Sequence, residues 1–493
     1  MRHYSVCLLS LVCLTLLGRV QAQQSKTSLL ALVPEIIRQA QETAQGIRDA
    51  REKAFALGFI TVTQARLGDI DGAKQTADRI IETDATRRFK ADALIAVGEA
   101  QAQSGDREGA RRNFSDVKQR MAGISAFDKA LLLADLGVAQ AKAGELEDAK
   151  QTATDVVGSD PGPVSRLSNI RILEAIAQSQ FQSGDVAGAN QTIEGFKFSS
   201  DRMIIWRWMA RAQIESGDLK GARLTLVRLK QMEAVMSDVF ASSPNYITSD
   251  DISSLVEIAE LEVKAGDVAS GRQILSSAKR TAGRMSKPED KASGLRIVAE
   301  AQALTGDLAG AKQTAAGIND SNEKKLTLVA VAAATAKAPH SDKNSARQIL
   351  RSVKAAAGIG LASKKLEILC DIAITQARIG DVNDALQTES GMSASNEKTM
   401  ALHAIVEAQL LAGDKESAKR TLIREKQVLE RMRGPVVNAD YKVAVLTDIA
   451  EGQVQAGDIV AAKQTAAGVS SAPGKTVVLA TIARVLAESN AKK

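Results

Sequence analysis

The chain has 493 residues, of which 25% are charged and only 3% are aromatic, and its formal net charge is +6. A balance of 64 basic against 58 acidic residues is too even for the concentrated positive surface that nucleic-acid backbones require. Alanine, the best helix former, is abundant, and no stretch shows the period-2 alternation of β-branched residues that is typical of a strand. The composition therefore indicates an all-α protein.

The first segment, residues 1–22, has the form of a secretory signal peptide. Arg2 begins it, an apolar run at 6–17 follows, and Val20-Gln21-Ala22 is typical of a cleavage site before Gln23. The apolar run is too short to span a bilayer as a mature helix. We therefore expect an extracytoplasmic protein, periplasmic or secreted, with no membrane span after cleavage of the signal peptide.

One motif recurs eleven times after a predicted N-terminal capping helix at 23–49. In each unit an apolar helical stretch is followed by Gly-Asp-x-x-x-Ala or a close variant. The loop positions are Gly68, Gly105, Gly144, Gly184, Gly217, Gly266, Gly306, Ser341, Gly380, Gly413 and Gly457. Because repeats of this length form stacked supersecondary units, the pattern predicts a right-handed α-solenoid of about eleven helix-turn-helix repeats.

Each unit carries the apolar stripe of an amphipathic first helix. In the unit of Gly68, Leu57 and Ile60 lie eleven and eight residues before the glycine, and a small residue usually lies seven before it. The glycine ends the first helix, and the aspartate after it caps the second. The repeated aspartates are therefore predicted to be helix caps rather than metal ligands, and no cofactor is expected.

These offsets resemble the tetratricopeptide repeat, over about residues 50–469. The resemblance implies a protein- or peptide-binding scaffold that uses a concave face. The tyrosine of that family, four residues before the loop glycine, is replaced by glutamine in most units, so the repeats are degenerate and poor in aromatic residues. Pentatricopeptide and HEAT-like repeats share parts of the pattern, and the subfamily stays open.

The spacing between loop positions varies from 33 to 49 residues because the second helices differ in length. From Gly266 onward, long and short second helices are predicted to alternate. The longest interval contains a predicted loop or hinge at 241–254, between repeats at 50–240 and repeats at 255–472. Segment 473–493 resembles a first helix without a second one, and we expect it to be a C-terminal capping helix.

The position six residues before the loop glycine is frequently acidic. The tetratricopeptide resemblance implies that this position faces the concave groove, where carboxylates would favour a basic or polar peptide. A solvated helix face is the alternative. The candidate binding residues at this position are Glu99, Gln178, Arg211, Glu260, Glu300, Glu407 and Glu451.

Trp206 and Trp208 are the only tryptophans of the chain. Trp206 takes the core leucine position. Trp208 lies off that stripe, and with Arg207 and Arg211 it forms a candidate binding anchor. Packing of Trp208 against the next repeat is the alternative.

Cys370 and His403 both lie ten residues before their loop glycines, in adjacent units. A thiol beside an imidazole could be activated, so a thiol-dependent enzyme is one alternative function, and His403 is also a candidate binding residue. A buried structural cysteine is favoured because no orienting group is identifiable. The leading function is an exported, non-enzymatic scaffold that binds a protein or extended peptide. A pentatricopeptide-like nucleic-acid binder is the other alternative.

Overall fold

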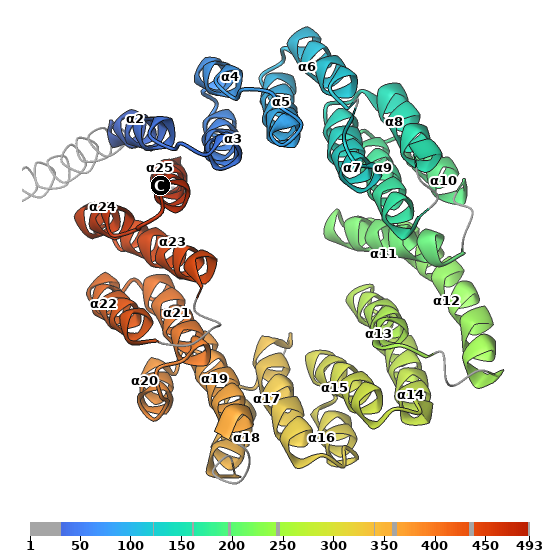
Figure 1. Ribbon diagram of the computed structural model, residues 1–493. Coiled ribbons are helices and arrows are strands. Elements are labelled where there is room, and N and C mark those ends of the chain that lie inside the picture. Colours follow the sequence, from blue (N-terminus) through green and yellow to red (C-terminus); the bar gives the residue numbers. More distant parts are fainter. Residues whose placement is uncertain are drawn as a thin grey trace, which may run out of the picture. The chain divides into compact units, whose positions relative to one another are not determined.

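The computed structural model describes residues 31–491, apart from 122, 160–161, 196–198, 243–246, 340, 357–361 and 433–437. Within these residues there are twenty-four helices and no strand (Figure 1). The helices pair in chain order as predicted, so the all-α solenoid class is confirmed. The predicted signal peptide lies outside the described residues.

Eleven first helices and eleven second helices alternate along the chain. The first helices are α3 (Ala50–Arg66), α5 (Arg87–Gln103), α7 (Ala126–Lys142), α9 (Pro163–Gln182), α11 (Ser199–Glu215), α13 (Ser249–Lys264), α15 (Pro288–Leu304), α17 (Ser321–Lys337), α19 (Ala362–Arg378), α21 (Asn396–Leu411) and α23 (Ala439–Gln455). The second helices are α4 (Ile70–Asp78), α6 (Arg107–Gln119), α8 (Leu146–Ser159), α10 (Val186–Glu194), α12 (Leu219–Ser242), α14 (Val268–Arg284), α16 (Leu308–Ala316), α18 (Lys343–Ala356), α20 (Val382–Ser390), α22 (Lys415–Arg431) and α24 (Ile459–Ala467). Second helices alternate between long and short from α14 to α24, which confirms that prediction.

The loop between the two helices of a unit has the geometry that its residues predict. All ten loop glycines have φ between +77° and +93°, a conformation that a side chain disfavours. The next residue caps the second helix, as where Asp69 accepts from the Gly72 N–H at 3.0 Å. Asp381 is an exception, because its carboxylate pairs with both arms of the Arg347 guanidinium at 2.7 Å.

The glutamine four residues before the loop glycine is buried and bridges the two helices of its unit. Gln64 Nε2 donates to Asp69 Oδ2 at 2.8 Å, and its Oε1 accepts from Thr76 Oγ1 at 2.7 Å. The same threonine-to-glutamine bond recurs at 2.7–2.9 Å in Thr152–Gln140, Thr192–Gln180, Thr225–Gln213, Thr314–Gln302, Thr388–Gln376 and Thr465–Gln453. We call this pair of hydrogen-bonding side chains the Gln–Thr clamp.

The clamp is also visible in the sequence. All nine units with glutamine four residues before the loop glycine carry threonine or asparagine eight residues after it. The two units with Glu262 and Lys337 in place of glutamine carry Ile274 and Ile349 instead. The glutamine thus occurs together with a residue that can hydrogen-bond to it, and an apolar residue takes that second position where the glutamine is absent.

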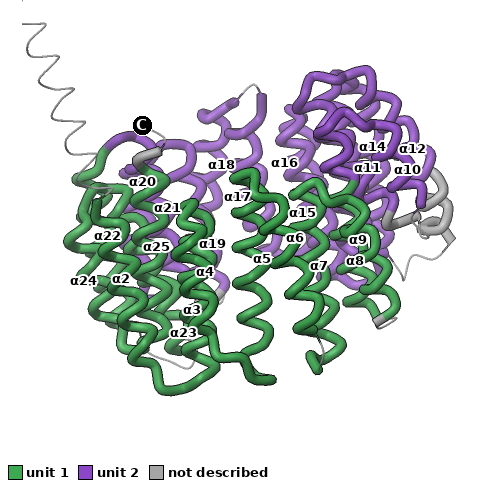
Figure 2. The backbone as a smooth tube through the Cα atoms, turned by 90° about the horizontal axis from the view of Figure 1, so that it is seen from above, with its two compact units in different colours: residues 1–176, 414–493 green, residues 177–413 purple. Residues whose placement is uncertain are grey.

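The chain divides into two compact units (Figure 2). Unit 1 comprises Met1–Ile176 and Asp414–Lys493, and unit 2 comprises Ala177–Gly413. Within each unit, successive first helices pack against one another, as α3 does with α5 and α13 with α15. The predicted hinge at 241–254 lies within unit 2, but residues 241–242 belong to α12 and residues 249–254 to α13, so those parts of it are helical. The predicted domain limits stay predictions.

The N-terminal and C-terminal segments of unit 1 share one core. Helix α25 (Ala472–Ala491) packs against α23 and α24, as predicted for a capping helix. Its other side is covered by α2 (Leu32–Gln45) and α3, and Ile36, Leu57 and Ile482 belong to one buried cluster. Helix α2 thus supplies the second helix that the last unit lacks. We call this junction the seam.

Candidate binding site

The exposed side of the first helices, which we call the first-helix face, presents the residues 13 and 9 positions before the loop glycine. On α3 these are Phe55 and Phe59, and on α23 they are Ala444 and Asp448. On α25, Val477 and Thr481 correspond to them, because Leu479 and Ile482 take the two buried apolar positions. The three helices are neighbours at the seam.

A pocket of about 1130 Å³ opens on this face at the seam, and we call it the seam pocket. Small residues create the hollow. Val477 and Thr481 line its floor on α25 and Ala444 its side on α23, where longer side chains would fill it. Gly474 lets α25 approach α23, because a Cβ at this position would lie 2.5 Å from Val443 Cγ2. The volume slightly exceeds the range of about 300–1,000 Å³ that is typical of small-ligand pockets.

Three phenylalanines, of only nine in the chain, form one wall of the seam pocket. Phe55 and Phe59 come from α3 and Phe89 from the first turn of α5. The Phe55 ring meets the Phe89 ring edge-to-face with 6.0 Å between centroids. Phe55 remains 43% exposed, and Phe59 and Phe89 are half-buried, so part of this wall faces solvent.

The rim of the seam pocket is acidic. Asp49 and Glu52 lie at the start of α3, and Asp440 and Asp448 lie on α23, against Arg51 as the only basic lining residue. Asp49 caps α3 by accepting from the Glu52 N–H at 2.8 Å. Among the described residues, no basic side chain lies within 4.0 Å of the carboxylates of Asp49, Glu52 or Asp440. The rim therefore places acidic groups beside an apolar surface.

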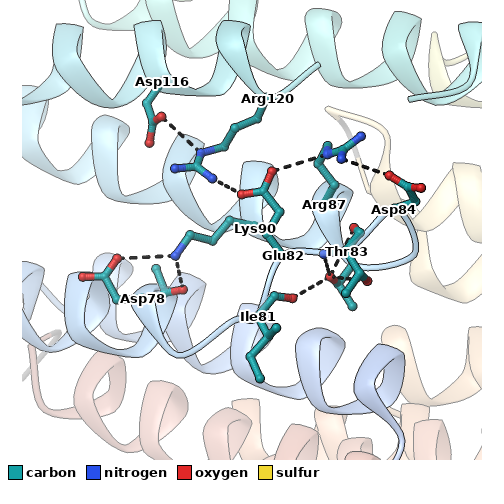
Figure 3. Close-up of polar contacts among 11 residues, drawn as sticks. Asp78, Ile81, Glu82, Thr83, Asp84, Arg87, Lys90, Asp116 and Arg120 are labelled. Atoms are coloured by element: carbon teal, nitrogen blue, oxygen red, sulfur yellow. Dashed lines mark hydrogen bonds and ion pairs between the residues drawn. The ribbon is translucent and has the colours of Figure 1, made fainter. Parts of the chain in front are cut away.

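A polar network fixes the loop that leads into α5 (Figure 3). Glu82 pairs with Arg120 of α6 and with Arg87 at 3.4 Å. Lys90 Nζ reaches back to the carbonyl oxygen of Ala77 at 2.6 Å. Since Arg87 and Lys90 flank Phe89, these contacts set the direction of the first turn of α5.

The predicted anchor around Trp208 is largely engaged within unit 2. Arg207 and Arg211 both pair with Glu257 of α13, at 2.9 and 2.7 Å. The Trp208 ring contacts Phe181 edge-to-face, with 6.0 Å between centroids. Burial lowers the pKa of Arg207, an effect that Glu257 opposes. Trp208 is half-buried, and its role as a binding anchor stays a prediction.

The predicted acidic positions also meet neighbours. Glu260 and Glu300 lie on adjacent first helices, and burial, opposed by Lys264 and strengthened by Glu300 and Glu257, raises the pKa of Glu260. Glu99 pairs with Lys142 at 3.6 Å, Glu451 with Arg484 at 3.2 Å, and Glu407 approaches His403 at 3.8 Å. Gln178 is half-buried on α9. As binding residues, all of these stay predictions.

Cys370 is buried on α19, with 3% of its surface exposed. Burial first, and the carboxylates of Asp371, Glu397 and Glu367 in addition, raise the pKa of its thiol to about 12. A thiol in this environment is protonated at neutral pH and is a poor nucleophile. The described residues contain no cluster of three potential metal ligands, and none of their helices is long and apolar enough to cross a membrane.

The seam pocket was not predicted from the sequence. Phe55, Phe59, Ala444 and Asp448 lie 13 or 9 positions before their loop glycines, and the other wall and rim residues lie still further from them. The predicted binding positions lie six residues before the loop glycine. The signal that was present is the occurrence of Phe55, Phe59 and Phe89 within two units of an aromatic-poor chain. Their meeting with α23 and α25 depends on the seam, which no local pattern indicates.

Comparison with known proteins identifies no family: no family model matches the sequence, and no curated protein matches it. Solved structures include a circular tandem repeat protein with 15% identity, covering 95% of this chain and 98% of that one at a TM-score of 0.23. A second is the Naa15/Naa10 structure bound to HypK-THB, with 12% identity, 90% and 75% coverage and a TM-score of 0.22. A third is the pentatricopeptide repeat protein PPR10 from maize, with 11% identity, 90% and 78% coverage and a TM-score of 0.25. The helix pairs themselves define the class, an α-solenoid of helix-turn-helix repeats.

Proposed function

We propose that the protein is an exported, non-enzymatic scaffold that binds a protein or extended peptide along its first-helix face. The observation that carries this proposal is the seam pocket, an open hollow with an aromatic wall on that face. Stacked helix pairs offer a long surface with few enclosed polar sites, and such surfaces suit extended partners. The high pKa of the Cys370 thiol supports a structural role for that residue.

Site-specific photo-crosslinking tests the binding surface. A photo-reactive amino acid replaces Val477 on the first-helix face or, as a control, Val460, which is 69% exposed on the second helix α24. The full chain is expressed in its native host before irradiation. We expect a discrete protein adduct from the position of Val477 and none from that of Val460. Equal labelling at both positions, or an adduct with nucleic acid, would contradict the proposal.

Export is tested separately. Mass spectrometry of the protein recovered from the extracytoplasmic fraction should give a mature N-terminus at Gln23. Recovery of the chain from the cytoplasm with Met1 retained would refute export and leave the binding surface to be judged by the crosslinks.

A further inference from the structure

We propose that the seam pocket binds a peptide segment in which a bulky apolar side chain is flanked by lysine or arginine. This inference rests on the proposed scaffold function and adds the chemistry of the partner. It follows from two features that occur together on the first-helix face: the aromatic wall and the acidic rim.

The aromatic wall selects the apolar part of the ligand. Phe55 and Phe89 meet edge-to-face, which leaves the exposed part of Phe55 available to a ligand side chain. Thr481 and Val477 are too small to fill the space opposite. An aliphatic or aromatic side chain would bury this apolar surface at about 25 cal/mol per Å².

The acidic rim selects the charge of the ligand. Glu52 and Asp49 lie on the α3 side, and Asp440 and Asp448 lie on the α23 side, so a chain crossing the pocket meets carboxylates on both sides. Arg51 is the only basic residue in the lining. A basic residue before and after the apolar side chain would meet this arrangement, whereas an acidic peptide or a phosphate backbone would be repelled.

The openness of the hollow to the first-helix face favours a peptide over a second copy of the chain. A stable dimer buries about 1,200–2,000 Å², and the aromatic wall comprises only three side chains. A peptide needs just one side chain inserted in the pocket, with its backbone lying across the rim.

The test uses the full mature chain and short fluorescein-labelled peptides, with binding measured by fluorescence anisotropy. One peptide has leucines flanked by lysines, a second has glutamates in place of the lysines, and a third has serines in place of the leucines. We expect the leucine–lysine peptide to bind at least about 10-fold more tightly than either of the others, a difference of about 1.4 kcal/mol. Equal binding of all three would overturn the inference.

Matched variants locate the site. Phe55→Ser should weaken the leucine–lysine peptide by about 10-fold or more. Phe127→Ser, which removes a similarly exposed phenylalanine from α7 outside the pocket, should leave it unchanged. The Glu52→Gln/Asp440→Asn variant should weaken binding and flatten its salt dependence, while Glu108→Gln/Glu147→Gln on the second helices should not. An equal loss in Phe127→Ser and Phe55→Ser would place the peptide elsewhere.

Two further outcomes are decisive. If sedimentation shows a dimer that Phe55→Ser dissociates, the pocket holds a second copy and the inference is wrong. If crosslinks form at the position of Val477 but no labelled peptide binds, the scaffold function stands and only the peptide chemistry fails. Circular dichroism melts confirm that each variant is folded.

Discussion

Unit 2 contains a second pocket, of about 620 Å³, at the first turns of α15 and α17, and it differs from the seam pocket in its side chains. Its described lining includes Lys291 and Lys364 beside three acidic residues, and no aromatic residue. Lys364 pairs with Glu367 at 2.9 Å and approaches Glu323 at 3.7 Å. In the seam pocket, by contrast, acidic groups stand beside exposed phenylalanine rings.

The difference indicates which hollows can hold a ligand. Curved rows of helices leave spaces between their ends, so a space alone is a consequence of repeat packing. In the α15–α17 pocket Lys364 already pairs with Glu323 and Glu367, and a basic ligand would compete with those pairs. In the seam pocket the protein offers apolar surface and negative charge that a ligand can cover without breaking an ion pair that involves Asp49, Glu52 or Asp440.

The largest effect is expected from breaking the seam. Ile36 of α2 is fully buried against the C-terminal helices, and Ile36→Ala should cost about 3 kcal/mol. Hydrogen exchange should then show lost protection in α25 and α3, with weaker binding of the leucine–lysine peptide.

The matched control for the seam is Ile258→Ala, a fully buried isoleucine of α13 in unit 2. It should cost a similar free energy while α25 and α3 keep their protection. If Ile36→Ala left exchange in α25 unchanged, the packing of α2 on α25 would be refuted.

Two buried glutamates differ in how burial and neighbouring charges affect them. Glu262 of α13 pairs with Lys230 at 2.8 Å, and Glu262→Gln should destabilise the protein by about 2 kcal/mol. Burial, together with the Asp448 carboxylate beside the seam pocket, raises the pKa of Glu425 well above its usual range. Glu425→Gln should therefore stabilise the protein at pH 8.

The raised pKa of Glu425 sets the direction in which the stability of the protein changes with pH. Its pKa is higher in the folded chain than in the unfolded chain, so its contribution to stability is complete below the ordinary value of 4.5 and is lost as pH rises through the raised value. Thermal melts should show Glu425→Gln and the parent chain equal at pH 4 and the variant higher at pH 8. A lower melting temperature of the variant at pH 8 would contradict this account.

The scaffold beneath the two pockets is expected to be equivalent. The Gln–Thr clamp is present in a helix pair that lines each pocket, as Thr465–Gln453 in α23–α24 and Thr314–Gln302 in α15–α16. Thr465→Val and Thr314→Val should each cost about 1 kcal/mol in urea unfolding, because each leaves a buried amide oxygen without its donor. Unequal losses of unfolding free energy would show that the two pockets also differ in the packing of the helix pairs that carry them.

Much of the fold follows from the sequence because its causes are local. The stripe exemplified by Leu57 and Ile60, the left-handed Gly68 and the cap Asp69 act within one helix pair, so their spacing predicts that pair. The Gln–Thr clamp was equally available as a covariation between units, such as Gln64 with Thr76 against Glu262 with Ile274. The glutamines were recognised as a departure from tyrosine, whereas their threonine partners were not predicted.

The binding site was less predictable because its causes are not local. Glu260, Glu300 and their equivalents are acidic positions on a helix face. The sequence of such a row does not reveal which of these charges are neutralised by neighbouring side chains. The seam joins residues such as Ile36 and Ile482, which lie at opposite ends of the chain. No repeat pattern specifies that α2 completes the last unit, so the wall and rim of the seam pocket become neighbours only in the three-dimensional structure.

The smallest expected effect separates the contribution of charge to peptide affinity from that of the aromatic wall. Lys364→Gln removes a basic group from the α15–α17 pocket and leaves Glu323 and Glu367 without this partner, so the pocket takes on the acidic character of the seam rim. In a Phe55→Ser background, where the seam pocket is impaired, this change should alter the affinity for the leucine–lysine peptide by less than about 2-fold, or about 0.4 kcal/mol. The physical reason is that exposed carboxylates alone contribute little in water, and the α15–α17 lining has no aromatic surface to bury. Recovery of tight binding in the double variant would mean that charge is sufficient, and the phenylalanine wall of the seam pocket would then not be the selective feature.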